Sequence, residues 1–474
     1  MKKIILLFLL GFSGIVHAVT PASVFSDNMV LQRDTPVRVW GTAEPGEAIT
    51  VSFRGCQADT VAGKDGRWLV SLPALPASSQ GETLEIRGRN TVAFENVLTG
   101  DIWLCVGQSN MQLDVFTIKN GREMAAKADH PSIRLLQIPL VWSRKPEMSV
   151  AAKWQLCVPE TAGRFSGVAY LFGKELSETL RVPVGLINIS WGGCRIEAMI
   201  AADTPAEVQV PEGVKRNYNN ELADMAGKKD EELRKDKQRL ASVLFNAMVH
   251  PLSPMAVKGM LWYQGEDNHT EGMEYSEKLK MLAHTWRKAF QQESLPIYLV
   301  LLPPFLYGQE KPLFLPRFRF AQQQFAESDP HAGFIVTSDC GDENDIHPRD
   351  KVPLAHRLAA LALFKTYGIG GTESLAPTCS KIEFKGSTAV VTFANANGLK
   401  TRDGKPVSYL EIAGKDKIFH PASGVLSGER LFVSSPAVKE AAHVRFGWHK
   451  TANPNLVNRI GNPATPFSTC PLEL

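Results

Sequence analysis

The stretch DIWLCVGQSNM, residues 101–111, joins a short apolar run to a serine flanked by small polar residues and a glycine. The run at 101–106 is apolar enough for a strand buried on both faces. Gly, Ser and Asn are common turn residues, so residues 107–110 alone fit an ordinary turn. They also fit a turn that presents the Ser109 hydroxyl as a nucleophile. The choice depends on whether the chain supplies a base and an oxyanion site on one scaffold.

The scaffold is predicted by four further apolar runs, at residues 185–190, 258–263, 297–302 and 333–338. Helical patterns lie between and after them, at 166–180, 279–290, 317–328 and 353–368. Five apolar strands that alternate with helices predict a parallel sheet covered on both faces. We therefore expect an α/β catalytic domain over residues 99–372, with insertions near 131–160, irregular or β-like, and 211–240. The charge run at 228–239 indicates a solvated helix face, with a binding role as the lesser alternative.

Both flanks of this domain look all-β. Residues 19–98 and 373–474 contain short strand patterns separated by Gly, Pro, Asn and Asp turn signals. They predict an N-terminal β domain and a C-terminal β region, each resembling a β-sandwich.

Composition and the N-terminus narrow the class of protein. With 44% hydrophobic and 21% charged residues and a formal net charge of +3, the chain is typical of globular proteins and indicates no nucleic-acid partner. Two lysines, an apolar run and Val16-His17-Ala18 predict a signal peptide over residues 1–18, hence a periplasmic or secreted protein. No later stretch predicts a membrane span. The seven cysteines show no metal-ligand spacing, and export permits disulfides without revealing any pairing.

Chemistry-bearing residues follow the predicted strands. In an open parallel sheet, ligands bind beyond the carboxyl ends of the strands. The residues that follow four of the predicted strands, group by group, are Ser109; Gly192, Gly193 and Arg195; Gln264, Glu266, Asp267 and Asn268; and Asp342, Asp345 and His347. A serine nucleophile needs a base, and His347 is the histidine on this edge. The Ser109 N–H, an N–H at Gly192–Gly193 and the Gln264 amide are candidate oxyanion donors. Each residue also has an ordinary structural explanation, but those explanations predict no common location.

Four motifs in order carry a family resemblance: GQSNM at 107–111, WGG at 191–193, WYQGE at 262–266 and DIHP at 345–348. With FNAMVHPL at 245–252, they resemble the sialate O-acetylesterase family of SGNH-type hydrolases. The resemblance extends from residues 24–32 to 463–467, nearly the whole mature chain. It implies a three-layer, SGNH/flavodoxin-like core with a five-stranded sheet. It also implies hydrolysis of sugar O-acetyl esters without metal or cofactor.

The resemblance further implies residue roles. Ser109 is expected to be the nucleophile and His347 the base, with oxyanion donors at Ser109, Gly193 and Gln264. The acid is less defined, because Asn344 stands where many SGNH hydrolases carry it. Asp345, Asp342 or a backbone carbonyl are the alternatives for orienting His347. The substrate-binding candidates are Gln108, Arg195, Glu266 and Asn268. Arg195 suits a substrate carboxylate, and a structural salt bridge is an equal alternative.

Three functional hypotheses follow. The leading one is a serine esterase that deacetylates sialic acids, with the 9-O-acetyl ester as the expected substrate. An esterase for acetylated xylan or another polysaccharide is the enzymatic alternative. A non-catalytic carbohydrate-binding protein is the alternative from another class, since β-sandwiches often carry sugar sites.

Overall fold

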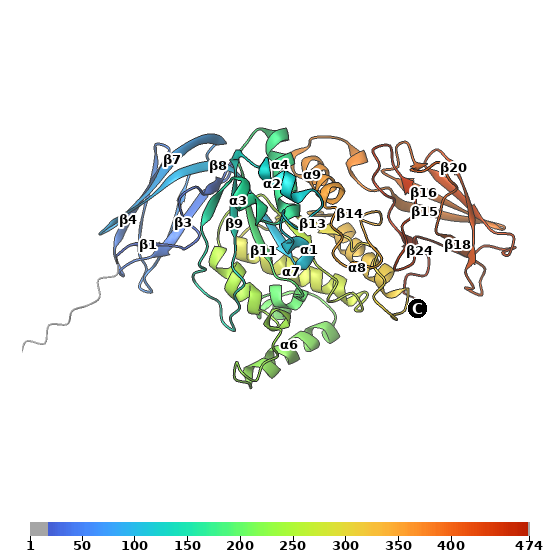
Figure 1. Ribbon diagram of the computed structural model, residues 1–474. Coiled ribbons are helices and arrows are strands. Elements are labelled where there is room, and N and C mark those ends of the chain that lie inside the picture. The colour runs from blue at the N-terminus through green and yellow to red at the C-terminus, as the bar shows by residue number, and fades with distance from the viewer. Residues whose placement is uncertain (1–17, 473–474) are drawn as a thin grey trace, which may run out of the picture.

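The long strand β8, Thr91–Gly107, belongs to two parts of the molecule. In the computed structural model, which describes residues 18–472, its first half pairs antiparallel with β7, Ser78–Arg87. Its second half pairs parallel with β11, Val184–Ser190, and β12, Gly259–Tyr263. Burial changes accordingly, from partly exposed at the start to continuous from Val97 to Gly107. One strand thus links the N-terminal β region to the central sheet (Figure 1).

The central sheet is larger than the sequence predicts. Its order is β10-β9-β11-β8-β12-β13-β14, where β9 spans His130–Gln137, β10 Trp154–Cys157, β13 Ile297–Val300 and β14 Ala332–Ile335. The five predicted strands are present and parallel. Within residues 18–472, β9 adds a sixth parallel strand and β10 an antiparallel edge. The prediction of five strands is wrong because Arg134 interrupts the apolar pattern of β9, although its side chain is buried.

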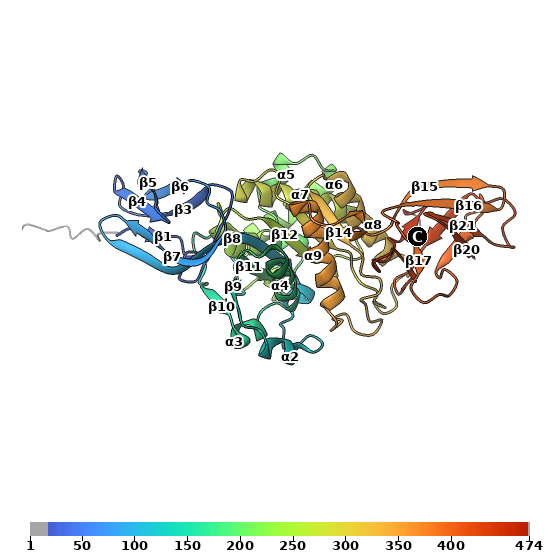
Figure 2. The ribbon, with the colours of Figure 1, turned by 90° about the horizontal axis from the view of Figure 1, so that it is seen from above.

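Helices cover both faces of the sheet. On one face α4, Gly167–Leu180, and α9, Val352–Tyr367, pack against each other; on the other lie α7, Glu274–Phe290, and α8, Phe314–Ser328 (Figure 2). Local sequence sets their ends: the Ser166 hydroxyl accepts the Ala169 N–H at the start of α4, and Gly368 ends α9 with φ +68°. The short helix α1, Ser109–Gln112, follows β8, and two others, α2, Gly121–Ala126, and α3, Pro159–Gly163, pack against each other.

The insertion contains helices, but its charge run is not one of them. Helix α5 spans Thr204–Glu207 and α6 spans Glu212–Ala226, which projects from the body of the protein (Figure 1). Residues 227–236 form turns, followed by a single 3₁₀ turn at Lys237–Arg239. The expectation of a helix over 228–239 is therefore wrong. A nearly all-charged segment has no apolar stripe to pack, and packing supplies most of the stability of a protein helix.

The two flanking β regions lie at opposite ends of the molecule (Figures 1 and 2). The N-terminal strands are β1 Thr20–Pro21, β2 Val30–Gln32, β3 Val37–Thr42, β4 Ala48–Phe53, β5 Cys56–Val61 and β6 Arg67–Leu72. The C-terminal strands are β15 Thr378–Lys385, β16 Thr388–Ala394, β17 Lys400–Thr401, β18 Leu410–Ala413, β19 His420–Pro421, β20 Ser423–Ser427, β21 Arg430–Ser434, β22 His443–Phe446, β23 Leu456–Val457 and β24 Phe467–Ser468. The N-terminal core is continuous with that of the central body, whereas the C-terminal region has a separate core.

Three sequence expectations concern the termini, membranes and cysteines. The predicted signal peptide, residues 1–18, falls outside the described residues except for its last one. Between residues 18 and 472, no helix is long and apolar enough to cross a membrane. All seven cysteines lie in that range and are unpaired.

Asp101 joins the N-terminal region, the sheet and α9. Its carboxylate is fully buried and accepts two hydrogen bonds from Arg33, at 3.0 and 2.9 Å. Gln32 donates to the same carboxylate at 3.0 Å, and the Tyr367 hydroxyl donates at 3.0 Å. A buried carboxylate with this many donors is well compensated, and removing it leaves several buried donors unpaired.

Asp101→Ala is expected to lower the free energy of unfolding by about 3 kcal/mol, because Arg33 loses the buried one of its two carboxylate partners. Urea denaturation measures it. Asp224→Ala is the matched control, since Asp224 pairs with Lys228 on the exposed face of α6 and such pairs contribute less than about 1 kcal/mol. Equal effects of the two variants would contradict the structural role of Asp101.

Candidate active site

Ser109 follows β8 at the point where the ends of β8, β11 and β12 are aligned. Gly107, the last residue of β8, is in register with Ser190 of β11 and Tyr263 of β12. A Cβ on Gly107 would lie 2.0 Å from the Tyr263 carbonyl oxygen, and its φ is +156°, so only glycine fits. The next residue, Gln108, donates its N–H to the same carbonyl at 3.1 Å. These contacts turn the chain sharply, so that Ser109 begins α1 with a partly exposed side chain.

His347 reaches Ser109 from the loop between β14 and α9. Its Nε2 lies 2.8 Å from Ser109 Oγ, although 238 residues separate the two in sequence. Burial lowers the pKa of His347 below its ordinary value, and the neighbouring Asp345 carboxylate opposes this shift. The imidazole therefore stays neutral, and able to accept a proton, to a lower pH than a free histidine.

The Gly192–Gly193 pair forms a turn beside the serine. The Cys194 N–H donates to the Trp191 carbonyl at 3.1 Å, and Gly193 has φ +70°, which defines a type II turn with glycine at its third position. A Cβ on Gly192 would lie 3.4 Å from that of Ser109, so the turn packs directly against the nucleophile candidate.

The orientation of this turn is fixed from two sides. Gln112 of α1 accepts the Gly192 N–H at 2.7 Å, and Gln238 of the insertion donates to the Gly192 carbonyl at 3.4 Å. In the described part of the chain, the N–H groups of Ser109 and Gly193 donate to no protein acceptor. Both N–H groups are therefore available to an acceptor outside the protein, as an oxyanion donor must be.

Gln264 does not fit the third donor position. It is fully buried, and its amide donates to the Cys194 carbonyl at 2.9 Å and to Asn268 Oδ1 at 2.8 Å. Its own oxygen accepts the Tyr275 hydroxyl at 2.6 Å. With both amide hydrogens used, Gln264 supports the turn from below rather than facing an oxyanion.

In the described part of the chain, the carboxylates near His347 form no hydrogen bond to its ring. Asp345 Oδ1 accepts the backbone N–H of His347 at 2.8 Å, and Asp342 Oδ1 accepts that of Asn344 at 2.9 Å. Within residues 18–472, no side chain hydrogen-bonds to His347 Nδ1. Both aspartates thus bind the backbone of this loop. Asp345 bonds to His347 itself, whereas Asp342 bonds to Asn344.

Three of the four predicted substrate-binding residues are buried. Gln108 accepts the Gly265 N–H at 3.2 Å, and Glu266 accepts from Asn110 at 2.6 Å. Asn268 donates to Glu197 at 3.1 Å and to Glu271 at 2.9 Å. Direct contact of these three with substrate is not supported, because their side chains are almost inaccessible.

Arg195, the fourth, forms ion pairs. It contacts Glu197 at 2.8 Å and Glu271 at 2.6 Å, and Lys278 pairs with the same two carboxylates at 2.7 and 2.6 Å. Of the two alternatives for Arg195, the structure has the salt bridge. These charges hold the segment after the Gly192–Gly193 turn to the start of α7.

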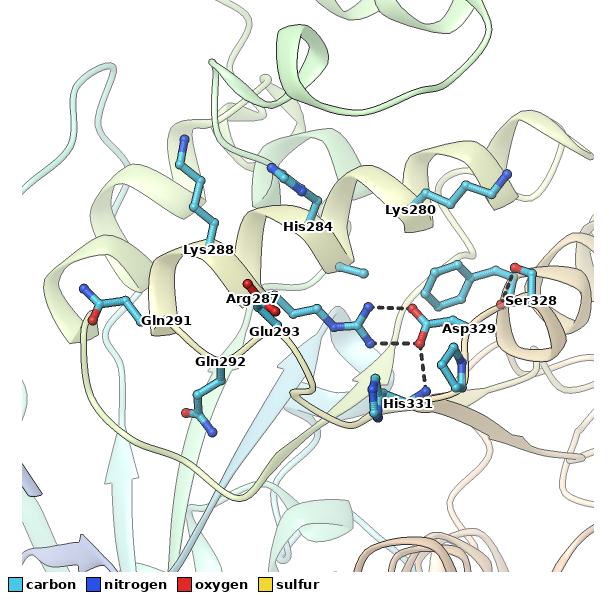
Figure 3. Close-up of a pocket in the computed structure, with 13 residues that line it drawn as sticks. Lys280, His284, Arg287, Lys288, Gln291, Gln292, Glu293, Ser328, Asp329 and His331 are labelled. Atoms are coloured by element: carbon cyan, nitrogen blue, oxygen red, sulfur yellow. Dashed lines mark hydrogen bonds and ion pairs between the residues drawn. The ribbon is translucent and has the colours of Figure 1, made fainter. Parts of the chain in front are cut away.

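A cavity between the ends of α7 and α8 lies away from Ser109. It has a volume of about 990 Å³ and is lined by the ends of α7 and α8, as Figure 3 shows. These helix ends precede β13 and β14, so the cavity is at the amino edge of the sheet, opposite to the serine. Its cations are paired: Arg287 binds Asp329 at 2.6 Å, and Lys288 binds Asp203 at 2.8 Å. It is not part of the Ser109 site.

A hydroxyl bonded to an imidazole beside two free N–H groups is the arrangement of an acyl-transferring hydrolase. Similarity to known proteins narrows this class. The family described as carbohydrate esterase, sialic acid-specific acetylesterase, matches residues 99–363. Human sialate O-acetylesterase is 32% identical over 399 residues, 76% of this chain and 74% of the human protein. The mouse protein of the same name is 29% identical over 421 residues, 78% and 77% of the two chains.

A solved structure agrees. The crystal structure of a carbohydrate acetylesterase from Xanthomonas citri superposes with a TM-score of 0.86 at 34% identity, covering 95% of this chain and 99% of that one. The α/β body with β regions on both sides is thus shared with a carbohydrate esterase. The chain belongs to the carbohydrate esterase family of sialic acid-specific acetylesterases, and it is an ester hydrolase.

Gly193→Ala tests the turn beside Ser109. The added Cβ has space, but alanine at this position must keep a left-handed φ, which costs about 1 kcal/mol. If the turn relaxes to relieve this strain, the direction of the residue 193 N–H changes. Loss of one oxyanion donor is expected to lower kcat on p-nitrophenyl acetate roughly 100-fold. Gly428→Ala, at φ +60° in a C-terminal turn with nothing near its Cβ, is the control for strain alone. Equal activity of the two variants would remove Gly193 from the site.

Proposed function

We propose that this esterase removes O-acetyl groups from sialic acids, with Ser109 as the nucleophile of an SGNH-type catalytic core. The observation that carries the proposal is the 2.8 Å contact between Ser109 Oγ and His347 Nε2 beside the free N–H groups of Ser109 and Gly193. Family membership and the named relatives support the substrate class. The 9-O-acetyl ester is the proposed bond, since the C9 oxygen is a terminal primary position that reaches a serine at a sheet edge.

In this mechanism, Ser109 Oγ attacks the acetyl carbonyl carbon while His347 Nε2 takes the hydroxyl proton. The carbonyl oxygen becomes an oxyanion, which the Ser109 and Gly193 N–H groups bind. The intermediate then expels the sugar oxygen, which receives the proton from the imidazolium. Water, deprotonated by the same imidazole, attacks the acetyl-enzyme, and acetate leaves as Ser109 is reprotonated.

Asp345 is the proposed third member of the triad, the carboxylate that acts on His347. Its negative charge raises the pKa of His347 against the effect of burial, so it stabilises the imidazolium that forms during acyl transfer. Its hydrogen bond goes to the His347 backbone, so its action on the ring is by charge and by placement of the loop. Asp342 remains the alternative.

A second substrate class is favoured by one observation. The Xanthomonas citri protein, similar over nearly the whole chain, is a carbohydrate acetylesterase, a class wider than esterases of sialic acids. The same machinery therefore also suits acetylated xylan or another acetylated polysaccharide. Export, predicted from residues 1–18, would place the enzyme in contact with either substrate.

The decisive measurement is acetate release from 9-O-acetyl sialic acid and from acetylated xylan. We expect faster release from the sialic acid, and at least a 1000-fold loss for Ser109→Ala on both, because the covalent step needs the hydroxyl. The variant should keep the melting temperature of the wild type. Preference for xylan would select the second substrate class. Sugar binding without hydrolysis, and without labelling of Ser109 by an organophosphonate, would select a carbohydrate-binding protein.

The pH profile of kcat/KM on p-nitrophenyl acetate tests the base. His347 acts in its neutral form, and its lowered pKa means that activity falls only as pH drops through a value below the ordinary 6.5. Asp345→Asn removes a charge that raises this pKa, so the acid limb should move to still lower pH and kcat should fall. Asp342→Asn is the control and should leave the limb in place. The reverse pattern would make Asp342 the acid.

A further inference from the structure

Asn110, the residue after the proposed nucleophile, is fully buried with every amide group bonded. Its Nδ2 donates to Glu266 Oε1 at 2.6 Å and to the Ile346 carbonyl at 2.9 Å. Its Oδ1 accepts from Lys351 Nζ at 2.6 Å. Because an ammonium only donates and a carboxylate accepts, Lys351 and Glu266 together fix which end of the amide faces which partner.

The bond to Ile346 acts on His347. The Ile346 carbonyl and the His347 N–H belong to the same peptide group. Asn110 holds that group by its oxygen, and Asp345 holds it by its N–H at 2.8 Å. The peptide plane from which the His347 side chain projects is thus fixed at both ends.

This restraint on the backbone matters because few hydrogen bonds hold the His347 ring directly. In residues 18–472, the Ser109 hydroxyl is the side-chain group bonded to the imidazole. The direction in which Nε2 points toward Ser109 therefore depends on the position and orientation of the His347 backbone. A displacement of about 1 Å in a reacting group can cost 100-fold in rate.

We propose that Asn110 is the positioning residue of His347, and that Glu266 and Lys351 act by fixing its amide. This inference rests on the proposed roles of Ser109 and His347. It assigns to Glu266 a role other than substrate contact. Through Asn110, the Glu266 side chain supports both the turn that carries Ser109 and the loop that carries His347. Lys351, which precedes α9, gives the third support and also lies over the Tyr263 ring at 5.3 Å.

The test is Asn110→Ser, assayed with p-nitrophenyl acetate across pH. Serine is too short to reach Ile346, so the His347 loop loses one of its two restraints. We expect kcat to fall about 100-fold with KM changed less than about threefold. The acid limb should move up toward pH 6.5, because a freed imidazole becomes more exposed. Labelling of Ser109 by an organophosphonate should slow in parallel with kcat.

Asn455→Asp is the matched control. Asn455 is also buried and bonds a loop, donating to Asp403 at 2.9 Å and to the Pro406 carbonyl at 3.0 Å, but it lies in the C-terminal region. It is expected to lower the melting temperature and leave kcat and the acid limb unchanged. A merely structural Asn110 would behave in the same way, and that outcome would overturn the proposal.

Lys351→Met is the second variant, informative where Asn110→Ser does not fold. It keeps Asn110, replaces a buried charge with an apolar chain of similar length, and should fold. With the amide less constrained, kcat should fall about 10-fold at unchanged KM. Wild-type kcat in Lys351→Met and Asn110→Ser, with Ser109→Ala inactive, would sink the positioning role while leaving the proposed function intact. An active Ser109→Ala would sink both.

Discussion

The close approach of β8 and β12 is the constraint on which the rest of the site depends. Gly107 lies so near the Tyr263 carbonyl that no side chain fits, and Gln108 bonds to the same oxygen. The chain must then turn away from the sheet, which puts Ser109 at the start of a helix with its N–H free. Strand order reverses at this point, where β8 lies between β11 and β12, and such reversals open a crevice at the carboxyl ends of parallel strands. The position of Ser109 is thus a consequence of sheet topology.

A layer of buried polar groups holds the segment that follows the Gly192–Gly193 turn. Gln264 bonds the Cys194 carbonyl and Asn268, and Asn268 in turn bonds Glu197 and Glu271. Buried polar groups are stable only when their hydrogen bonds are made, so each of these side chains is committed to its neighbours. In the described residues, the backbone N–H groups of Ser109 and Gly193 have no protein acceptor, and the turn fixes the direction of the Gly193 N–H.

The sequence predicted what periodicity and strand ends determine, and missed what depends on burial. Five strands were predictable because each is an unbroken apolar run, and the gathering of Ser109, Gly193 and His347 followed from parallel strands ending at one edge. The region of β9 was predicted only as an irregular or β-like insertion, because Arg134 breaks its apolar pattern. Gln264 and Glu266 were misassigned because a polar side chain after a strand faces either the crevice or the interior, and sequence does not distinguish these directions. Lys351 had no sequence signal, since a lysine is seldom buried.

The open side of the site is built from segments that the sheet does not position. Gln238 bonds to the Gly192 carbonyl, and the neighbouring Arg239 bonds to the Gly193 carbonyl at 3.3 Å and pairs with Asp267. Both residues lie in the 3₁₀ turn Lys237–Arg239 at the end of the insertion, whose charge run forms no α-helix. The insertion therefore closes over the oxyanion turn through side chains alone, while α1 and β8 support it from within. A scaffold of this kind keeps Ser109 and the Gly192–Gly193 turn on elements fixed by the sheet, and leaves the open side of the turn to a segment that the sheet does not position.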